Sequence, residues 1–234
     1  MDELIVLYED NHIIVTVKPQ NIPSQGDSTG DLSQLDIVKN YIKTAANKVG
    51  NAFVGLVHRL DRPTGGVMVF AKTSKAAARL SQQIRDGELE KRYLAVVAGR
   101  PKEPRGRLVN ALLKDETANI VKIVPPATDG AKRAELDYVV LESSGKLSLV
   151  DIKLITGRSH QARAQMAGLN CPIYADQKYG AAEGKGGNLA LWAYSLKFEH
   201  PTTKQAMVFK VFPPETTPWQ GFAVSKYVNV VKPE

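Results

Sequence analysis

Short apolar runs, separated by turn residues, are the pattern that most constrains the fold of this chain. Residues 4–8 and 12–17 are two such runs, rich in β-branched residues, with a polar turn between them. Residues 134–141 and 147–155 form a second pair with the look of a hairpin. Because the predicted strands outnumber the helices and come in adjacent runs, we expect an α+β fold with a mostly antiparallel sheet.

The other elements follow from the same periodicities. Further strands are expected at 53–57, 67–71, 91–98, 189–196 and 207–212. Helices are expected after a cap at Asp31, from a cap at Thr73 or Ser74 through Ile84 with Gly87 closing the helix, and from a cap at Ser159 through Ala167. Loops are expected at 19–30, 101–107 and 179–188. No internal repeat or interdomain linker is apparent, so we expect one domain over residues 1–234.

Composition narrows the class of protein. The chain has 234 residues, 43% of them hydrophobic, which is ordinary for a globular protein with a sizeable core. The net charge of +7 favours an anionic partner such as nucleic acid. The single Cys171 excludes an internal disulfide and indicates a reducing compartment. Neither a signal peptide nor a membrane-spanning run is evident, so we expect a cytoplasmic protein without a membrane partner.

One carboxylate stands between two arginines in the segment His58–Gly66. Asp61 lies between Arg59 and Arg62, with an apolar run on either side and a Pro63-bearing loop that ends at Gly65-Gly66. The positive field favours the ionised acid, which suits a carboxylate nucleophile. A loop aspartate that forms a structural ion pair is the alternative interpretation.

The same string, with Thr64, Gly66 and the run ending in Ala71-Lys72-Thr73, resembles the signature of the RluA family of RNA pseudouridine synthases. Relatives usually have serine at the position of Gly65. The resemblance implies the pseudouridine synthase fold, a bent and mostly antiparallel mixed sheet flanked by helices and loops. It also implies that Asp61 is the catalytic residue.

Two more strings carry the resemblance. Residues 91–97 (KRYLAVV) match a K-x-Y-L-A-x-V pattern, which implies that Tyr93 stacks on a uracil extruded from the RNA. Residues 156–163 (TGRSHQAR) match a second pattern, which implies that Arg163 forms a salt bridge with the catalytic aspartate. Without the resemblance, Tyr93 would be half-buried packing and 156–163 a basic amphipathic segment.

Several residues near these strings are expected to bind RNA. Arg59 shares a face with Asp61 in an extended segment, whereas His58 faces the other way and is interpreted first as a structural hydrogen-bonding residue. Phosphate contacts, with solvated charge as the alternative, are expected of Lys18, Arg62, Lys72, Arg92 and Arg158. The full predicted RNA-binding set is His58, Arg59, Arg62, Lys72, Arg92, Arg158 and His160.

Weaker matches extend the resemblance over about residues 4–212. They include residues 8–19, 171–180 and 191–201, with Trp192 in place of a usual histidine. The stronger match at residues 156–163 has Ala162 in place of a usual isoleucine or leucine. The pattern begins almost at Met1, so we expect no separate N-terminal RNA-binding domain. Residues 213–234 lie outside the resemblance and are assigned no role.

The hypothesis from the sequence is therefore an isomerase that converts uridine to pseudouridine in a stem-loop of ribosomal or transfer RNA. It is expected to act as a monomer, without a metal, nucleotide or other cofactor, because the product has the same atoms as the substrate. No metal-ligand spacing, Walker loop or G-x-G-x-x-G string is present. The alternatives are a catalytically inactive RNA-binding or ribosome-assembly factor, and a glycosidase-like hydrolase, which would need a second carboxylate.

Overall fold

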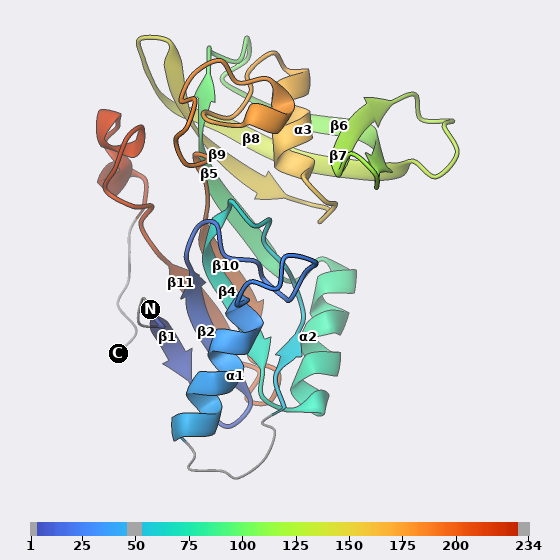
Figure 1. Cartoon of the computed structure of the whole chain (residues 1–234), viewed down its shortest axis with the longest axis vertical. Helices are drawn as coiled ribbons and strands as arrows, with labels where there is room; N and C mark the ends of the chain where they lie inside the picture. Colours follow the sequence, from blue (N-terminus) through green and yellow to red (C-terminus); the bar gives the residue numbers. More distant parts are fainter. Residues whose placement is uncertain (1–3, 46–52, 229–234) are drawn as a thin grey trace. The chain divides into compact units, whose positions relative to one another are not determined.

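The computed structural model describes residues 4–45 and 53–228, and these residues form two compact units (Figure 1). The described part of the first unit comprises residues 4–45, 53–89 and 193–211. The second unit comprises residues 90–192 and 212–228.

The first unit contains a sheet whose defined pairings are antiparallel, with order β1-β2-β4-β10-β11 and with β3 also paired to β4. Its elements are β1 (Val6–Glu9), β2 (Ile13–Lys18), α1 (Gln34–Ala45), β3 (Gly55–Leu56), β4 (Gly65–Ala71), α2 (Ser74–Asp86), β10 (Leu191–Glu199) and β11 (Ala206–Lys210). Every residue of β4 is buried, which is typical of a strand covered on both faces.

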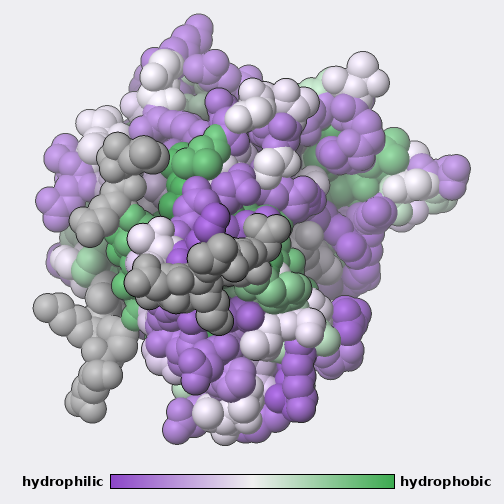
Figure 2. Space-filling model, turned by 60° about the horizontal axis from the view of Figure 1, so that its bottom comes forward, coloured by the Kyte–Doolittle hydropathy of each residue, from purple (hydrophilic) through white to green (hydrophobic). Residues whose placement is uncertain are grey.

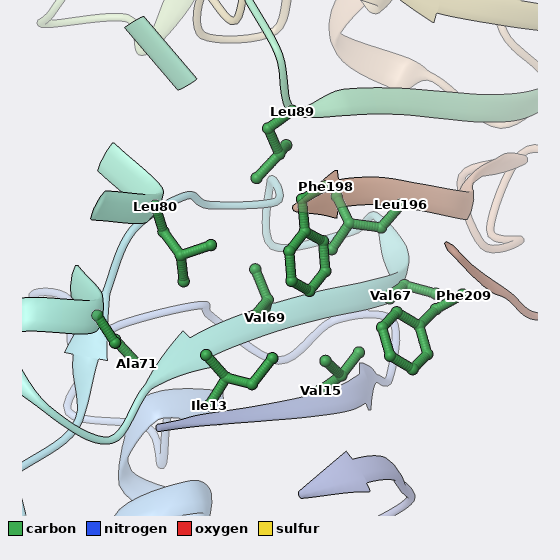
Figure 3. Close-up of a cluster of buried hydrophobic side chains, with 11 residues drawn as sticks. Ile13, Val15, Val67, Val69, Ala71, Leu80, Leu89, Leu196, Phe198 and Phe209 are labelled. Carbon is green, nitrogen blue, oxygen red and sulfur yellow. The ribbon is translucent and has the colours of Figure 1, made fainter. Parts of the chain in front are cut away.

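The two helices cover opposite faces of this sheet. Leu80 of α2 packs in a core cluster with Ile13 and Val69, and Figure 3 shows these side chains directed toward one another. The Gln34 amide of α1 donates to Thr16 Oγ1 at 3.1 Å, and Thr16 faces away from that cluster because successive strand residues alternate. The segment that joins β3 to β4 is therefore attached to a strand that is buried on both faces.

Side chains cap the first turn of both helices. Thr73 Oγ1 accepts from the Ala76 N–H at 3.1 Å, and Gly87 ends α2 with φ +74°, as the sequence predicted. The predicted cap of α1 is wrong: Ser33, not Asp31, caps the helix. Ser33 Oγ accepts from the Asp36 N–H, and the Asp36 carboxylate accepts from the Ser33 N–H, both at 3.2 Å.

The second unit contains an antiparallel sheet with order β5-β9-β8-β6-β7. Its elements are β5 (Glu90–Ala98), β6 (Arg105–Asp115), β7 (Ile120–Val124), β8 (Lys132–Ser144), β9 (Leu147–Leu154), α3 (Gln161–Gly168) and the short 3-10 helices η1 (Gln177–Tyr179), η2 (Trp219–Gly221) and η3 (Val224–Lys226). The predicted α+β class is confirmed, as is the hairpin that became β8 and β9.

The β6–β7 hairpin was not predicted. Residues 101–107 were interpreted as a loop, yet Arg105 already begins β6. Exposed charged residues interrupt the apolar pattern of β6, so its periodicity is weak in the sequence. Gly65 and Gly66 were also assigned to a loop and instead open β4, where Gly66 pairs with Lys18.

The surface in view in Figure 2 is mostly hydrophilic, with apolar side chains in smaller groups. Within residues 4–45 and 53–228, no helix has the length and apolar character needed to cross a membrane.

Candidate active site

Asp61 lies in the segment between β3 and β4, at the start of a tight turn. The Thr64 N–H donates to the Asp61 carbonyl at 2.9 Å, which closes the turn over Arg62 and Pro63. Asp61 is half-buried in the structure. The turn therefore holds a carboxylate at the end of a completely buried strand.

Residues 18–24 anchor this turn through its backbone. Ser24 Oγ donates to the Leu60 carbonyl at 2.7 Å and accepts from the Leu60 N–H at 3.0 Å. Lys18 Nζ donates to the Arg62 carbonyl at 3.1 Å. The Gln20 amide donates to the Pro63 carbonyl at 3.1 Å. The backbone on both sides of Asp61 thus has side-chain partners from a distant part of the sequence.

Lys18 has no exposed surface, so the prediction that it contacts an RNA phosphate is wrong. Burial lowers the pKa of its ammonium to about 7, the Asp61 carboxylate opposes that change, and the Arg62 guanidinium adds to it. The buried Lys18 side chain therefore holds the turn by a hydrogen bond to its backbone and interacts electrostatically with Asp61.

His58 and Arg59 have different environments. The imidazole of His58 is buried, and its Nε2 accepts from the Val69 N–H of β4 at 3.1 Å. An accepting Nε2 carries no proton, so this geometry suits the neutral ring. The interpretation of His58 as a structural hydrogen-bonding residue is therefore supported. Arg59 is exposed, and RNA binding by either residue stays a prediction.

Two basic residues of the first unit that were predicted to bind RNA already have acidic partners. Arg62 forms ion pairs with Asp27 at 3.5 Å and with Asp31. Lys72 pairs with Glu9 at 2.5 Å. A phosphate would have to compete with these carboxylates, which are partly exposed and therefore weakly held.

In the second unit, Tyr93 lies on the face of the sheet that α3 covers. Tyr93 is paired with Ile152 of β9, and Ile152 with Tyr138 of β8, so the three side chains point to the same side. The α3 face is identified by the Gln165 amide, which donates to Asn110 Oδ1 of β6 at 2.7 Å. Arg163 is carried by the same helix, so the fold places the predicted tyrosine and arginine on one side of the sheet.

Arg163 forms a bidentate ion pair that the sequence analysis missed. Its Nε and Nη2 donate to the two carboxylate oxygens of Asp176, each at 2.8 Å, and both side chains are buried. The guanidinium also lies over the Tyr179 ring, 5.1 Å from its centroid. Asp176 and Tyr179 both lie in residues 171–180, one of the weaker matches in the sequence, to which no role was assigned.

The start of α3 also differs from the prediction. Ser159 is not the cap; His160 holds that position with a left-handed φ of +48°, and its side chain makes no capping hydrogen bond. Instead, His160 Nδ1 lies 2.9 Å from the Tyr179 hydroxyl, which also accepts from the Val121 N–H at 2.8 Å. His160 therefore supports the ring against which Arg163 is held.

Arg92 and Arg158 lie apart from this cluster. Arg92 follows Lys91 and precedes Tyr93 on β5, so it points from the opposite face of the sheet, where it pairs with Asp151 and, at 3.8 Å, with Glu90. Arg158 is exposed, and its Nε donates to the Arg133 carbonyl at 3.1 Å. RNA binding by these two arginines stays a prediction.

The three departures from the family pattern lie in the packed interior. Gly65 opens the buried strand β4, Ala162 of α3 is 5% exposed and Trp192 of β10 is 7% exposed. Among residues 4–45 and 53–228, no group of three His, Cys, Asp or Glu side chains is arranged to hold a metal ion.

Asp61 belongs to the first unit, whereas Tyr93 and Arg163 belong to the second. The predicted salt bridge between Asp61 and Arg163 therefore stays a prediction. The pair with Asp176 uses two of the five N–H donors of a guanidinium, which makes Arg163 chemically able to serve a second carboxylate.

Comparison with known proteins gives one consistent family. The RNA pseudouridylate synthase family model matches residues 12–168. The dual-specificity RNA pseudouridine synthase RluA of Salmonella typhi is 34% identical, over 89% of this chain and 92% of that protein. The ribosomal large subunit pseudouridine synthase D of Borreliella burgdorferi is 33% identical over 89% of this chain. This chain spans 64% of that relative, and 67% of the uncharacterized RNA pseudouridine synthase YhcT of Bacillus subtilis.

The solved structures agree in fold. Human RNA pseudouridylate synthase domain containing 4 superposes with a TM-score of 0.76 at 24% identity, over 90% of this chain and 88% of that one.

Proposed function

Because this chain belongs to the RNA pseudouridine synthase family, of the RluA type, we propose that it isomerises specific uridines of large-subunit ribosomal RNA to pseudouridine. The ribosomal substrate is inferred from relatives whose names specify the large ribosomal subunit. The observation in the structure that carries the proposal is the position of Asp61, a half-buried carboxylate on a turn whose backbone is held by Lys18 and Ser24. A carboxylate held in place is suited to act at the ribose as a nucleophile or a base.

The reaction exchanges one bond to the ribose for another. The bond from uracil N1 to ribose C1′ breaks, the base turns, and a bond from uracil C5 to C1′ forms. The proton on C5 is lost and N1 gains one, so the product has the same atoms as the substrate. In this proposal, Asp61 either attacks C1′ or removes the proton from ribose C2′, and both routes begin with the ionised carboxylate.

The remaining roles are assigned to the residues of the matched strings. Tyr93 supports the extruded base, because an unstacked uracil needs an aromatic or apolar surface. Arg163 stabilises the Asp61 carboxylate. The two hydrogen bonds from Arg163 to Asp176 support this role, because they fix the position of the guanidinium. Arg59, which is exposed, occupies the space left in the RNA. Base extrusion costs least in a loop, so the target is expected in a stem-loop or bulge.

The test is a pseudouridine map of total RNA from cells that lack this protein. Each lost site is then tested for rescue by the wild type, by Asp61→Asn and by Arg105→Gln, which changes an exposed charge outside the proposed site. We expect loss of one or a few ribosomal sites, rescue by the wild type and by Arg105→Gln, and no rescue by Asp61→Asn.

Two other results would contradict the proposal. Rescue by Asp61→Asn, or no lost site, would favour an RNA-binding or assembly factor without catalysis. Release of free uracil from RNA by the purified protein would indicate a hydrolase. A lost site in transfer RNA would keep the chemistry and replace the ribosomal substrate.

A further inference from the structure

Lys91 is the basic residue of β5 that shares a face with Tyr93. The two residues are two positions apart on one strand, so their side chains point to the same side of the sheet. The pairing confirms this, because Lys91 opposes Leu154, Leu154 opposes Leu136, and Leu136 opposes Leu108 of β6. Lys91 therefore lies on the same face of the sheet as Tyr93, nearer the start of β5.

Among residues 4–45 and 53–228, no carboxylate oxygen lies within 4.0 Å of the Lys91 ammonium nitrogen, so Lys91 forms no ion pair there. The neighbouring acid, Glu90, points from the opposite face and binds Lys153 and Arg92 there. Lys91 is nonetheless half-buried, and burial lowers the pKa of its ammonium. A partly desolvated cation without a counter-ion is an unfavourable arrangement unless an anion arrives from outside.

Gly157 lies next to the Lys91 ammonium. A Cβ built on Gly157 would lie 3.1 Å from Lys91 Nζ, so the amine rests directly against the glycine backbone. Gly157 is exposed and lies in the segment that leads into α3 and Arg163. The Lys91 amine therefore lies against exposed backbone, on the face of the sheet that also carries Tyr93.

We propose that Lys91 and the backbone at Gly157 form a binding site for one phosphate of the RNA chain, next to the base held by Tyr93. This inference rests on the proposed function for the identity of the anion. The comparison with the other basic residues supports it. Arg62, Lys72 and Arg92 all have carboxylate partners, and Lys18 is completely buried, whereas Lys91 has none of these constraints.

The experiment measures binding of a fluorescently labelled RNA hairpin with an all-uridine loop, at a series of salt concentrations. Each phosphate contact releases counterions, so the loss of one contact reduces the slope of log affinity against log salt by about 1. We expect Lys91→Gln to weaken binding about tenfold at low salt and to reduce the slope by that amount. Lys91→Arg keeps the charge and is expected to retain most of the slope.

The control for net charge is Lys114→Gln, which removes an exposed lysine that already pairs with Glu116. An equal slope in Lys91→Gln and Lys114→Gln would overturn the proposal. Gly157→Ala tests the position of the site, because the added methyl group displaces the amine without removing its charge. We expect several-fold weaker binding, and unchanged binding would overturn the part assigned to Gly157.

Folding is followed by circular dichroism, and if Lys91→Gln is unfolded, Lys91→Arg and Gly157→Ala decide the question. The readout is affinity, so it does not depend on turnover. If the wild type binds the hairpin and Lys91→Gln keeps the wild-type slope, only the phosphate site fails. If the wild type does not bind the hairpin at all, both the phosphate site and the proposed RNA substrate fail.

Discussion

The Lys18 ammonium donates a hydrogen bond to the carbonyl of Arg62, the residue that directly follows Asp61. The same ammonium donates to the carbonyls of Pro19 at 2.9 Å and Ile22 at 2.6 Å, so each of its three N–H groups has an acceptor. A residue of β2 therefore fixes the backbone beside the proposed catalytic acid, and it does so without contact to solvent.

The stability of the protein is expected to rise between about pH 7 and pH 10.5 because of Lys18. The pKa of its ammonium is about 7 in the folded protein, whereas the ordinary pKa of a solvated lysine is 10.5. Between these values the unfolded chain binds the additional proton, so the free energy of unfolding increases with pH. Over the whole range from pH 7 to pH 10.5, this difference in pKa adds about 5 kcal/mol to the free energy of unfolding.

Lys18→Met removes this contribution. Urea unfolding at several pH values is expected to show a flatter pH dependence in Lys18→Met than in the wild type, with exposed Lys204→Met as the control. Parallel curves for the wild type and Lys18→Met would contradict the assignment.

Asp176→Asn is expected to destabilise the protein by about 3 kcal/mol, because it leaves the buried Arg163 guanidinium without its counter-charge. Asp137→Asn breaks a similar bidentate pair with Arg107 in which the arginine is largely exposed, and it is expected to cost less than about 1 kcal/mol. Thermal and urea unfolding of the two variants measure the difference. Equal losses of unfolding free energy in the two variants would show that burial does not determine how much the Arg163–Asp176 pair stabilises the protein.

Gly66→Ala is expected to destabilise the protein by more than about 3 kcal/mol. The added Cβ would lie 2.2 Å from the Ala193 carbonyl oxygen, and backbone is not able to move aside as a flexible side chain does. Gly145→Ala is the matched control, with φ +58° and no atom within 4 Å of the added carbon. It should cost only about 1 kcal/mol, the penalty of the left-handed conformation. The comparison fails if the two variants unfold at the same urea concentration.

His58 and Arg59 are adjacent in the sequence and should separate by phenotype. His58→Ala leaves the buried Val69 N–H without its acceptor, which is expected to cost about 2 kcal/mol of stability. Arg59→Ala removes an exposed side chain and is expected to change stability by less than about 0.5 kcal/mol while weakening RNA binding. Unfolding and hairpin-binding measurements on both variants test the separation. A stable His58→Ala protein with weak RNA binding would reverse the two roles.

The sequence predicts much of this fold where local signals are strong. Residues 73–87 have a threonine cap, one apolar stripe and a terminal glycine, and α2 follows that pattern. The start of α1 was misplaced because Asp31 and Ser33 are both acceptable caps. The choice depends on Asp36, which completes a reciprocal pair with Ser33, and on Arg62, which binds Asp31. Arg62 lies 31 residues from Asp31, beyond any local pattern.

The candidate site is predictable in its residue types and less so in its partners. Asp61, Tyr93 and Arg163 were predicted from short strings and their roles stay predictions, while the structure adds the partners of the Asp61 turn and of Arg163. Asp176 was missed as the partner of Arg163 because a buried ion pair has no periodic signal in the sequence. The burial of Lys18 was missed for the same reason, since a lysine at the end of a strand is ordinarily solvated.

Three side chains from residues 18–24 bind main-chain atoms of the turn that carries Asp61. Ser24 binds the backbone of Leu60, Lys18 the carbonyl of Arg62, and Gln20 the carbonyl of Pro63. Every amino acid has a main-chain carbonyl. A substitution at position 62 would therefore leave the hydrogen bonds from Ser24, Lys18 and Gln20 to the backbone in place. Evolution could therefore exchange the side chain next to the acid, and with it the preference for a particular RNA, without relocating the acid itself.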